Sequence, residues 1–182
     1  MDLFEAVSKR YSHKAAFSQE AVAEEHLRLI AEAGMSAPSG TNSESPEFIL
    51  ITAVNVLAEI GRITRHRPLI TAPAMIALVS NPADVLPGVT FYVEDYAAAT
   101  ENILLAATAL GFACGWIDHL LRPPEINDPL CRLLGIPPDR KLMVIIPIGK
   151  PCETAARRTK KTFEQRCSWN HYAIQRSSAQ GE

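Results

Sequence analysis

The stretch EDYAAATENILLAATALGFACGWI, residues 94–117, places a long helix directly before a glycine and a short strand. Apolar side chains dominate from Tyr96 to Leu110, and Gly111 is placed to end the helix. A helix that is apolar on all sides must be covered on all sides. A chain of 182 residues has few layers to do this alone, so the pattern favours a homodimer. The alternative is a monomer whose other helices suffice.

Helical and strand patterns alternate along the rest of the chain. Apolar residues at helical spacing predict helices over residues 2–9, 24–35, 54–64 and 124–134, the last ending at Gly135. Aliphatic runs predict strands over residues 48–53, 74–79, 112–117 and 142–148. This mixture, without an internal repeat or a linker, predicts one α+β or three-layer domain over residues 1–182. The polar end, from about residue 173, is expected to be flexible.

Composition excludes several classes of partner. The net charge is −2, with 18 basic and 20 acidic residues, which gives no reason to expect binding to nucleic acid or to an acidic membrane surface. The most apolar stretch, residues 97–110, is too short to span a bilayer and contains Glu101. The N-terminus lacks the apolar core of a signal peptide, so we expect a cytoplasmic protein. Four scattered cysteines and five histidines show no metal-binding spacing, and the cysteines are expected to be reduced and mostly buried.

Three polar clusters could contact a ligand. In the first, Arg10, Ser12 and Lys14 alternate, so an extended backbone would point all three side chains to one side. Two cations and a hydroxyl that converge suit a phosphate group. The alternative is an ordinary solvated loop with alternating charges.

The second and third clusters are also open to two interpretations. Small polar residues suit close approach to a flat ligand, or form a turn that ends a helix: Pro38, Ser39, Gly40, Thr41 and Asn42. A basic group near the C-terminus could complete a phosphate site, or could only solubilise a tail: Arg157, Arg158, Lys160 and Lys161.

Taken in order, these clusters and three further motifs resemble the FMN-dependent nitroreductase family, over roughly residues 3–172. The motifs are KRYSHKAAF (9–17), APSGTNSESPEF (37–48), AAATENILLAATALGFACGWI (97–117), LLGIPPDRKLMVIIPIGKP (133–151) and KKTFEQRCSWN (160–170). Each motif is loose, but chance is a poor explanation for five in the family's order. The resemblance implies an α/β/α sandwich with a mainly antiparallel central sheet, in an intertwined homodimer.

The resemblance also implies two FMN molecules at the dimer interface. Arg10 and Ser12 would hold the phosphate together with Lys160 or Lys161, and Lys14 would lie nearer the pyrimidine edge of the flavin. The other subunit would contribute Pro38, Ser39, Gly40 and Asn42, and the following residues would pass beside the isoalloxazine: Cys114, Gly115, Trp116 and Ile117.

The function implied is transfer of a hydride from NADH or NADPH, through the flavin, to a nitroaromatic, quinone or similar acceptor in ping-pong fashion. No catalytic side chain is required, because the flavin carries the chemistry. The chain has no GxGxxG motif, which agrees with a cofactor held by Arg, Lys and Ser. Two alternatives remain: another reaction on the same fold, such as flavin fragmentation or reductive dehalogenation, and a flavin-binding dimer without turnover.

Three departures from the family pattern affect the acceptor site. Glu44, Ser45 and Pro46 stand where the family usually has Gln-Pro-Trp, and a carboxylate there would disfavour an anionic reduced flavin or repel acidic acceptors. Residues 60–70 leave little room for the family's extra helix, so nearby arginines could replace part of that wall or stay as exposed charges: Arg62, Arg65 and Arg67. Residues 81–90 are short, which predicts a minimal lid.

Overall fold

Strand β2 (Ala74–Ser80) lies at the centre of the protein, and all seven of its residues are buried. It pairs antiparallel with β1 (Pro46–Ile51) on one side and with β4 (Lys141–Gly149) on the other. The short strand β3 (Ala113–Cys114) pairs with the far edge of β4, so the sheet order is β1-β2-β4-β3. The computed structural model describes residues 1–153 and 159–174 of the chain.

The alternation of side chains in β2 creates two apolar cores, one on each face of the sheet. Ile76 and Leu78 belong to one cluster, whereas Met75 and Ala77 belong to the other. Because strand side chains alternate between faces and both faces are covered, the strand is a continuous apolar run.

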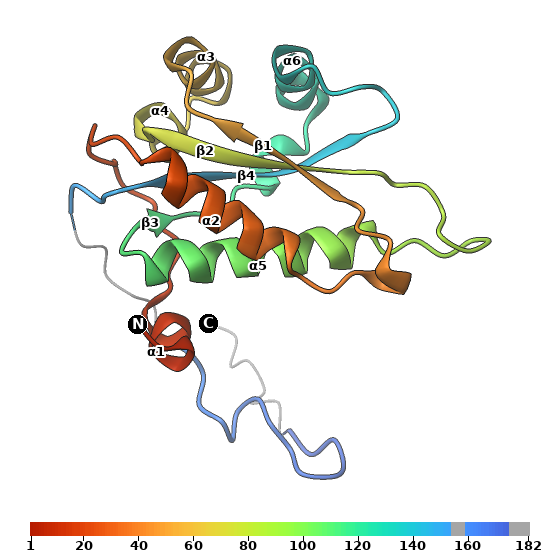
Figure 1. Cartoon of the computed structure of the whole chain (residues 1–182). Helices are drawn as coiled ribbons and strands as arrows, with labels where there is room; N and C mark the ends of the chain where they lie inside the picture. Colours follow the sequence, from red (N-terminus) through yellow and green to blue (C-terminus); the bar gives the residue numbers. More distant parts are fainter. Residues whose placement is uncertain (154–158, 175–182) are drawn as a thin grey trace, which may run out of the picture.

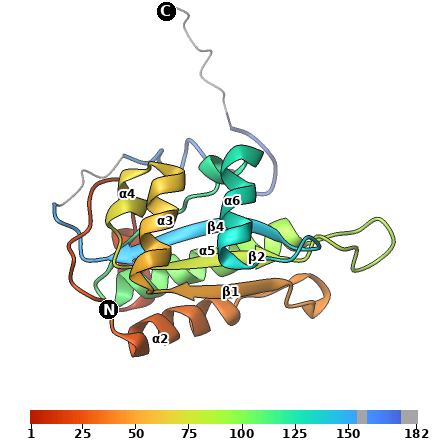
Figure 2. The same cartoon turned by 90° about the horizontal axis from the view of Figure 1, so that it is seen from above.

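Helices cover both faces of this sheet (Figures 1 and 2). One face carries α2 and α5, with α1 beyond α5, and the other face carries α3, α4 and α6. The helix bounds are α1 (Leu3–Lys9), α2 (Glu24–Met35), α3 (Val54–Thr64), α4 (Arg67–Thr71), α5 (Tyr92–Ala109) and α6 (Pro124–Leu134). Two single turns of 3-10 helix, η1 (Gly40–Asn42) and η2 (His119–Leu121), lie in the loops. The predicted α+β fold with three layers and an antiparallel sheet is confirmed.

Most predicted elements are confirmed, and the differences between predicted and observed bounds have physical causes. The helices at 24–35, 54–64 and 124–134 have the predicted bounds, and Gly111 and Gly135 follow α5 and α6 with φ of +79° and +66°. The first strand runs over 46–51 instead of 48–53, because pairing with β2 begins at its first residue. The predicted strand at 112–117 is reduced to two residues, followed by an isolated bridge at Ile117. Helix α4 was not predicted.

Helix α5 is covered by the chain itself more fully than its sequence suggested. Tyr96, Ile103 and Leu104 are buried on its inner side, while Ala97 and Leu105 on its outer side are half-buried. The apolar side chains of α1 are exposed instead: Leu3, Phe4 and Val7. Helix α1 therefore carries one group of exposed apolar side chains, and others lie elsewhere, as at Met35 and Val54. Within residues 1–153 and 159–174, none of the helices has both the length and the apolar character needed to cross a membrane.

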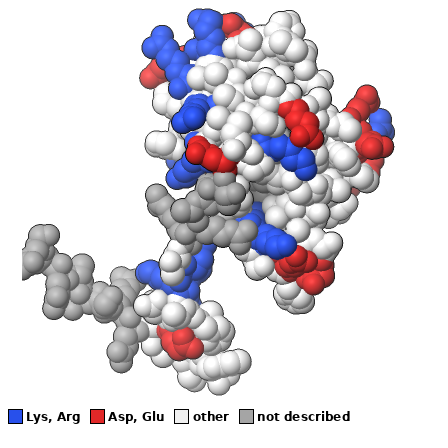
Figure 3. All heavy atoms as spheres, turned by 90° about the vertical axis from the view of Figure 1, so that its left-hand side faces the viewer, with Lys and Arg blue, Asp and Glu red and all other residues white. Residues whose placement is uncertain are grey.

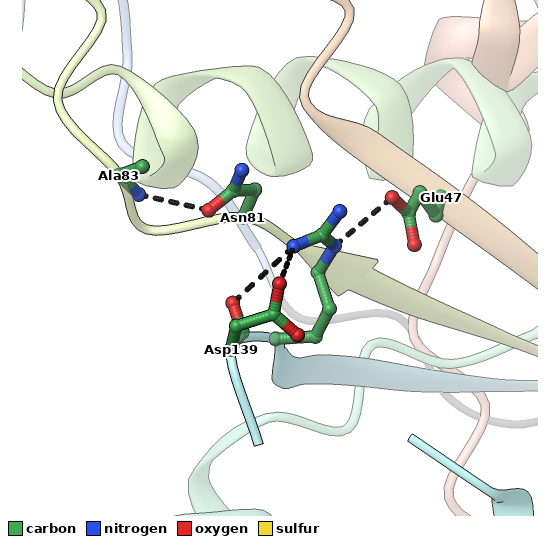
Figure 4. A network of polar contacts seen from close by, with 5 residues as sticks. Glu47, Asn81, Ala83 and Asp139 are labelled. Carbon is green, nitrogen blue, oxygen red and sulfur yellow. Dashed lines mark hydrogen bonds and ion pairs between the residues drawn. The ribbon is translucent and has the colours of Figure 1, made fainter. Parts of the chain in front are cut away.

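A cluster of ion pairs ties edge strand β1 to the turn before β4 (Figure 4). The Nε of Arg140 donates to Glu47 Oε1 at 3.0 Å, and its Nη1 donates to Asp139 Oδ2 at 2.6 Å. This contact joins strands that are not neighbours in the sheet, since β2 lies between them.

Candidate active site

Residues 10–14 leave α1 as an extended segment with alternating side chains. His13 is only 1% exposed, while Ser12 and Lys14 on either side of it are exposed. The His13 ring lies 4.6 Å from the ring of Phe17, and its Nε2 is 3.1 Å from the carbonyl oxygen of Ala16. The predicted alternation thus holds for Ser12 and Lys14, which are exposed on either side of buried His13, while Arg10 is only partly exposed.

This segment lies directly beside residues 113–117. The backbone N–H of His13 donates to the carbonyl oxygen of Cys114 at 2.8 Å, and Ser12 forms a parallel bridge with Cys114. A Cβ atom on Gly115 would lie 3.1 Å from the carbonyl oxygen of His13, so glycine permits this close approach. Two segments about 100 residues apart, both predicted to contact one ligand, are therefore neighbours.

Arg10 is held at the start of the segment by an acidic residue of α5. Its Nε lies 3.0 Å from Glu101 Oε1. A guanidinium has five N–H donors, so this ion pair leaves others that can bind an anion. Arg10 and the exposed hydroxyl of Ser12 can therefore act together on a phosphate group.

The side chains of residues 114–117 are mostly engaged with the core. The ring of Trp116 meets Tyr96 edge-on, with centroids 6.1 Å apart, and Ile117 exchanges two backbone hydrogen bonds with Ile145 at 3.0 and 3.2 Å. Burial raises the pKa of Cys114 to about 12, so its thiol stays protonated and is not a nucleophile. This segment therefore has no reactive thiol, and its partly exposed residues are Trp116 and Ile117.

The prediction that the cysteines are mostly buried is wrong. All four are free, but Cys131 is half-buried, and Cys152 and Cys167 are exposed. The exposed pair follows the last strand, where the chain has left the two cores of the sheet.

Two basic residues lie where α3 ends and α4 begins: Arg62 and His66. Burial and the positive charge of Lys14 lower the pKa of His66, the residue before α4. Arg62 donates to both carboxylate oxygens of Glu59, at 2.6 and 2.8 Å, and so behaves as an ordinary exposed arginine. Figure 3, which views the left-hand side of Figure 1, shows Lys and Arg side chains spread over this face with acidic side chains between them.

Residues 38–45 form a constrained loop instead of a simple turn. Thr41, Asn42 and Glu44 have φ of 55°, 56° and 47°, in the left-handed region that glycine favours. A Cβ atom on Gly40 would lie 2.1 Å from the Phe91 ring, so packing against Phe91 already requires a glycine there. Side chains of this loop also line a hollow of about 410 Å³ against α2 and β1: Pro38, Ser39 and Glu44.

The loop and the 10–14 segment lie at opposite ends of α5 (Figures 1 and 2). The loop contacts Asp95 in the first turn, whereas Cys114 lies beside Leu104. Nine residues of helix separate these points by roughly 14 Å along the axis. Within one chain, residues 10–14 and 113–117 are thus neighbours, whereas residues 38–45 face a different part of the surface.

The C-terminal basic residues are only partly described. Lys160 and Lys161 are exposed and lie in residues 159–174, a segment that extends past α1 in Figure 1. Arg157 and Arg158 lie outside the described residues. The predicted role of this segment in a phosphate site stays a prediction.

Residues 81–91 project from the body as a loop between β2 and α5 (Figures 1 and 2). A backbone bridge between Leu86 and Val89 closes its tip, and both side chains are exposed. The loop is thus a distinct projection, at the same end of α5 as residues 38–45.

Sequence reasoning missed Asp95. Its carboxylate is buried and accepts hydrogen bonds from the loop at residues 40–45. The only available indication was an acidic residue in the first turn of an otherwise apolar helix, which is common near helix N-termini.

The chain is similar to known proteins in sequence and in fold. The sequence profile described as "Nitroreductase family" matches residues 7–81 and 67–150. A protein of Archaeoglobus fulgidus named "Putative NADH dehydrogenase/NAD(P)H nitroreductase" is 31% identical over 136 residues, which are 74% of this chain and 78% of that protein.

Solved structures share the fold. A nitroreductase family protein from Clostridium novyi is 28% identical, with a TM-score of 0.72 over 83% of this chain and 86% of that one. A nitroreductase with bound FMN from Bacteroides fragilis has a TM-score of 0.74 at 23% identity, and the match covers 96% of this chain and 100% of that one.

Proposed function

The chain belongs to the nitroreductase family, and on that premise we propose that it is an FMN-dependent oxidoreductase. It would use NADH or NADPH to reduce a nitroaromatic, a quinone or a similar electrophilic small molecule. The proposal includes a homodimer and a cytoplasmic location.

The observation that carries the proposal is the contact between residues 10–14 and 113–117. The 2.8 Å hydrogen bond from His13 N–H to Cys114 oxygen holds these segments side by side, with Ser12 and Lys14 exposed along one of them. A hydroxyl and a guanidinium suit the phosphate of FMN, and the ammonium suits the polar edge of its ring system. The residues present therefore fit this cofactor.

Each residue would have a physical role toward FMN. Arg10 and Ser12 would bind the phosphate, with Lys160 or Lys161 beside them, and Lys14 would lie near the pyrimidine edge. FMN supplies the redox chemistry when it is bound, accepting a hydride from the nicotinamide and giving two electrons to the acceptor. A cation at ~4 Å stabilises the negative charge of the reduced ring by about 4 kcal/mol at surface-like dielectric, before desolvation.

Two features of the chain support a dimer. Residues 38–42 lie at the other end of α5 from residues 10–14, so a two-fold arrangement would let a partner's loop face this chain's phosphate-binding segment. The apolar side of α1 is exposed, with Phe4 83% accessible, and such patches mark interfaces. In the proposed dimer, the partner contributes the second half of each FMN site.

The test is an anaerobic titration of the purified protein. FMN added to the flavin-free protein should bind with quenched fluorescence, and NADH or NADPH should then bleach the bound flavin within the turnover time. Substrate and acceptor would use the same space in turn, so initial rates with quinone and nitroaromatic acceptors should show ping-pong kinetics. A protein that takes up no FMN contradicts the proposal, and so does consumption of FMN itself under oxygen.

A further inference from the structure

Asp95 joins the first turn of α5 to the loop at residues 40–45. It is 3% exposed, and its Oδ1 accepts the backbone N–H of Gly40 at 2.8 Å. Its Oδ2 accepts the hydroxyls of Ser45 at 2.7 Å and Ser43 at 3.2 Å. A single buried carboxylate thus fixes the loop at three points.

The loop needs such an anchor because its backbone is strained. Left-handed φ values are unfavourable for residues with a side chain, and this loop has them at Thr41, Asn42 and Glu44. Within the loop, Ser39 Oγ accepts the N–H of Glu44 at 2.9 Å. Strained conformations persist only where surrounding contacts over-determine them, and Asp95 supplies the contacts from outside the loop.

The exposure of the loop residues beside Asp95 indicates which part of the proposed site Asp95 supports. Pro38 and Asn42, which lie on or beside this loop, are exposed, and Ser39 is partly exposed. These are the residues that the family resemblance assigns to the flavin of the other subunit. Asp95 itself is only 3% exposed at the wall of the hollow beside Pro38 and Ser39, and both of its carboxylate oxygens accept hydrogen bonds from the loop.

We propose that Asp95 is a positioning residue that holds residues 39–45 in the one conformation able to receive FMN. This inference rests on the proposed function. Its basis is pre-organisation: when only a fraction of molecules has the competent conformation, the apparent Kd rises by the inverse of that fraction. A loop that is competent one-tenth of the time would therefore bind FMN tenfold more weakly.

The experiment compares Asp95→Ala with a matched control, Thr100→Val, in the full-length protein. Thr100 is also buried in α5, and its hydroxyl bonds only within the helix, to Tyr96 oxygen at 2.7 Å. Asp95→Ala should raise the Kd of FMN at least tenfold, whereas Thr100→Val should change it less than twofold. Asp95→Asn keeps an acceptor for the Gly40 N–H, so it should restore the Kd to within about threefold of wild type.

A second readout needs no cofactor. Hydrogen exchange of the flavin-free protein should show the Gly40 amide exchanging at least tenfold faster in Asp95→Ala, with the centre of α5 unchanged. Should Asp95→Ala fail to fold, the double variant Ser43→Ala/Ser45→Ala removes two of the three bonds and should raise the Kd by at least threefold.

The outcomes separate the two proposals. A wild-type protein that binds no FMN overturns the proposed function, and the flavin part of this inference with it, while exchange at Gly40 still decides whether Asp95 holds the loop. An Asp95→Ala variant with the Kd and the Gly40 exchange of Thr100→Val overturns the positioning role, whatever the activity. Equal losses in Asp95→Asn and Asp95→Ala also contradict it.

Discussion

Replacing Arg10 with alanine should weaken FMN binding far more than it weakens the fold. The change removes a charge-assisted hydrogen bond to the phosphate, which is worth about 1.5–3 kcal/mol. At about 1.4 kcal/mol for each factor of ten, the Kd should rise roughly 10- to 150-fold. The measurement is a fluorescence titration of FMN into flavin-free protein at fixed ionic strength.

The structural cost of this variant is small. The Arg10–Glu101 ion pair is accessible to solvent, with side-chain exposures of 21% and 45%, so it contributes only about 0.2–1 kcal/mol. The urea midpoint of Arg10→Ala should therefore stay close to that of the wild type. A weaker Kd could then not be attributed to unfolding.

The chain offers a closely matched control in Arg140 (Figure 4). Its Nε also lies 3.0 Å from a glutamate, Glu47, with exposures of 23% and 56%. Because Arg140 also pairs with Asp139, Arg140→Ala should cost at least as much stability as Arg10→Ala, and it should leave FMN binding unchanged. Riboflavin provides a ligand control, because it lacks the phosphate and its affinity should not depend on Arg10.

Two results would refute the reasoning about Arg10. An unchanged FMN affinity in Arg10→Ala would place the phosphate elsewhere on the protein. An equal loss of riboflavin and FMN affinity would show that Arg10 acts on the shape of the site instead of on the phosphate.

Further predictions concern packing, thiol reactivity and pH. Gly40→Ala should lower the free energy of unfolding by about 1–3 kcal/mol, because its Cβ would overlap the side chain of Phe91. The loss should be smaller in a Phe91→Ala background, which removes the ring but keeps the Phe91 Cβ at 2.5 Å, and a single variant as stable as wild type would contradict this. In native protein, a thiol reagent should label Cys152 quickly and Cys114 only after unfolding, and equal labelling rates would disprove the burial of Cys114. Burial lowers the folded-state pKa of His66 below its ordinary 6.5, so the unfolded state binds more protons and stability should fall as the pH drops below about 6.5, levelling off below the folded pKa; His66→Asn should flatten that part of a urea-midpoint profile, and an unchanged slope would count against it.

Local patterns predicted the elements whose boundaries are set locally. Helices α2, α3 and α6 have their predicted bounds because apolar spacing and end residues such as Gly135 act within one or two turns. Helix α4 was missed because its five residues are too few to show a period, although Pro68 in its first turn was a usable start signal. Strand β1 was misplaced by two residues because its bounds depend on pairing with β2.

The candidate site divides in the same way. The alternation of Ser12 and Lys14 about a buried position follows from extended backbone geometry, so it was predictable from the sequence. The interpretation of Gly40 as space for a ligand was incomplete, since Phe91 already fills the space beside it. The contact between Gly40 and Phe91, which are about 50 positions apart, produces no periodic pattern in the sequence around either residue.

Apart from α4, the sequence by itself determined the order of the helices and strands, the three-layer α+β class and the chemical character of residues 10–14, because these depend on neighbours within a few positions. Only the tertiary structure decided that His13 lies against Cys114, that residues 38–42 lie at the far end of α5, and that Asp95 anchors that loop. Hydrogen bonds across 55 or 101 residues form only after the sheet and helices have packed, and no local pattern specifies them.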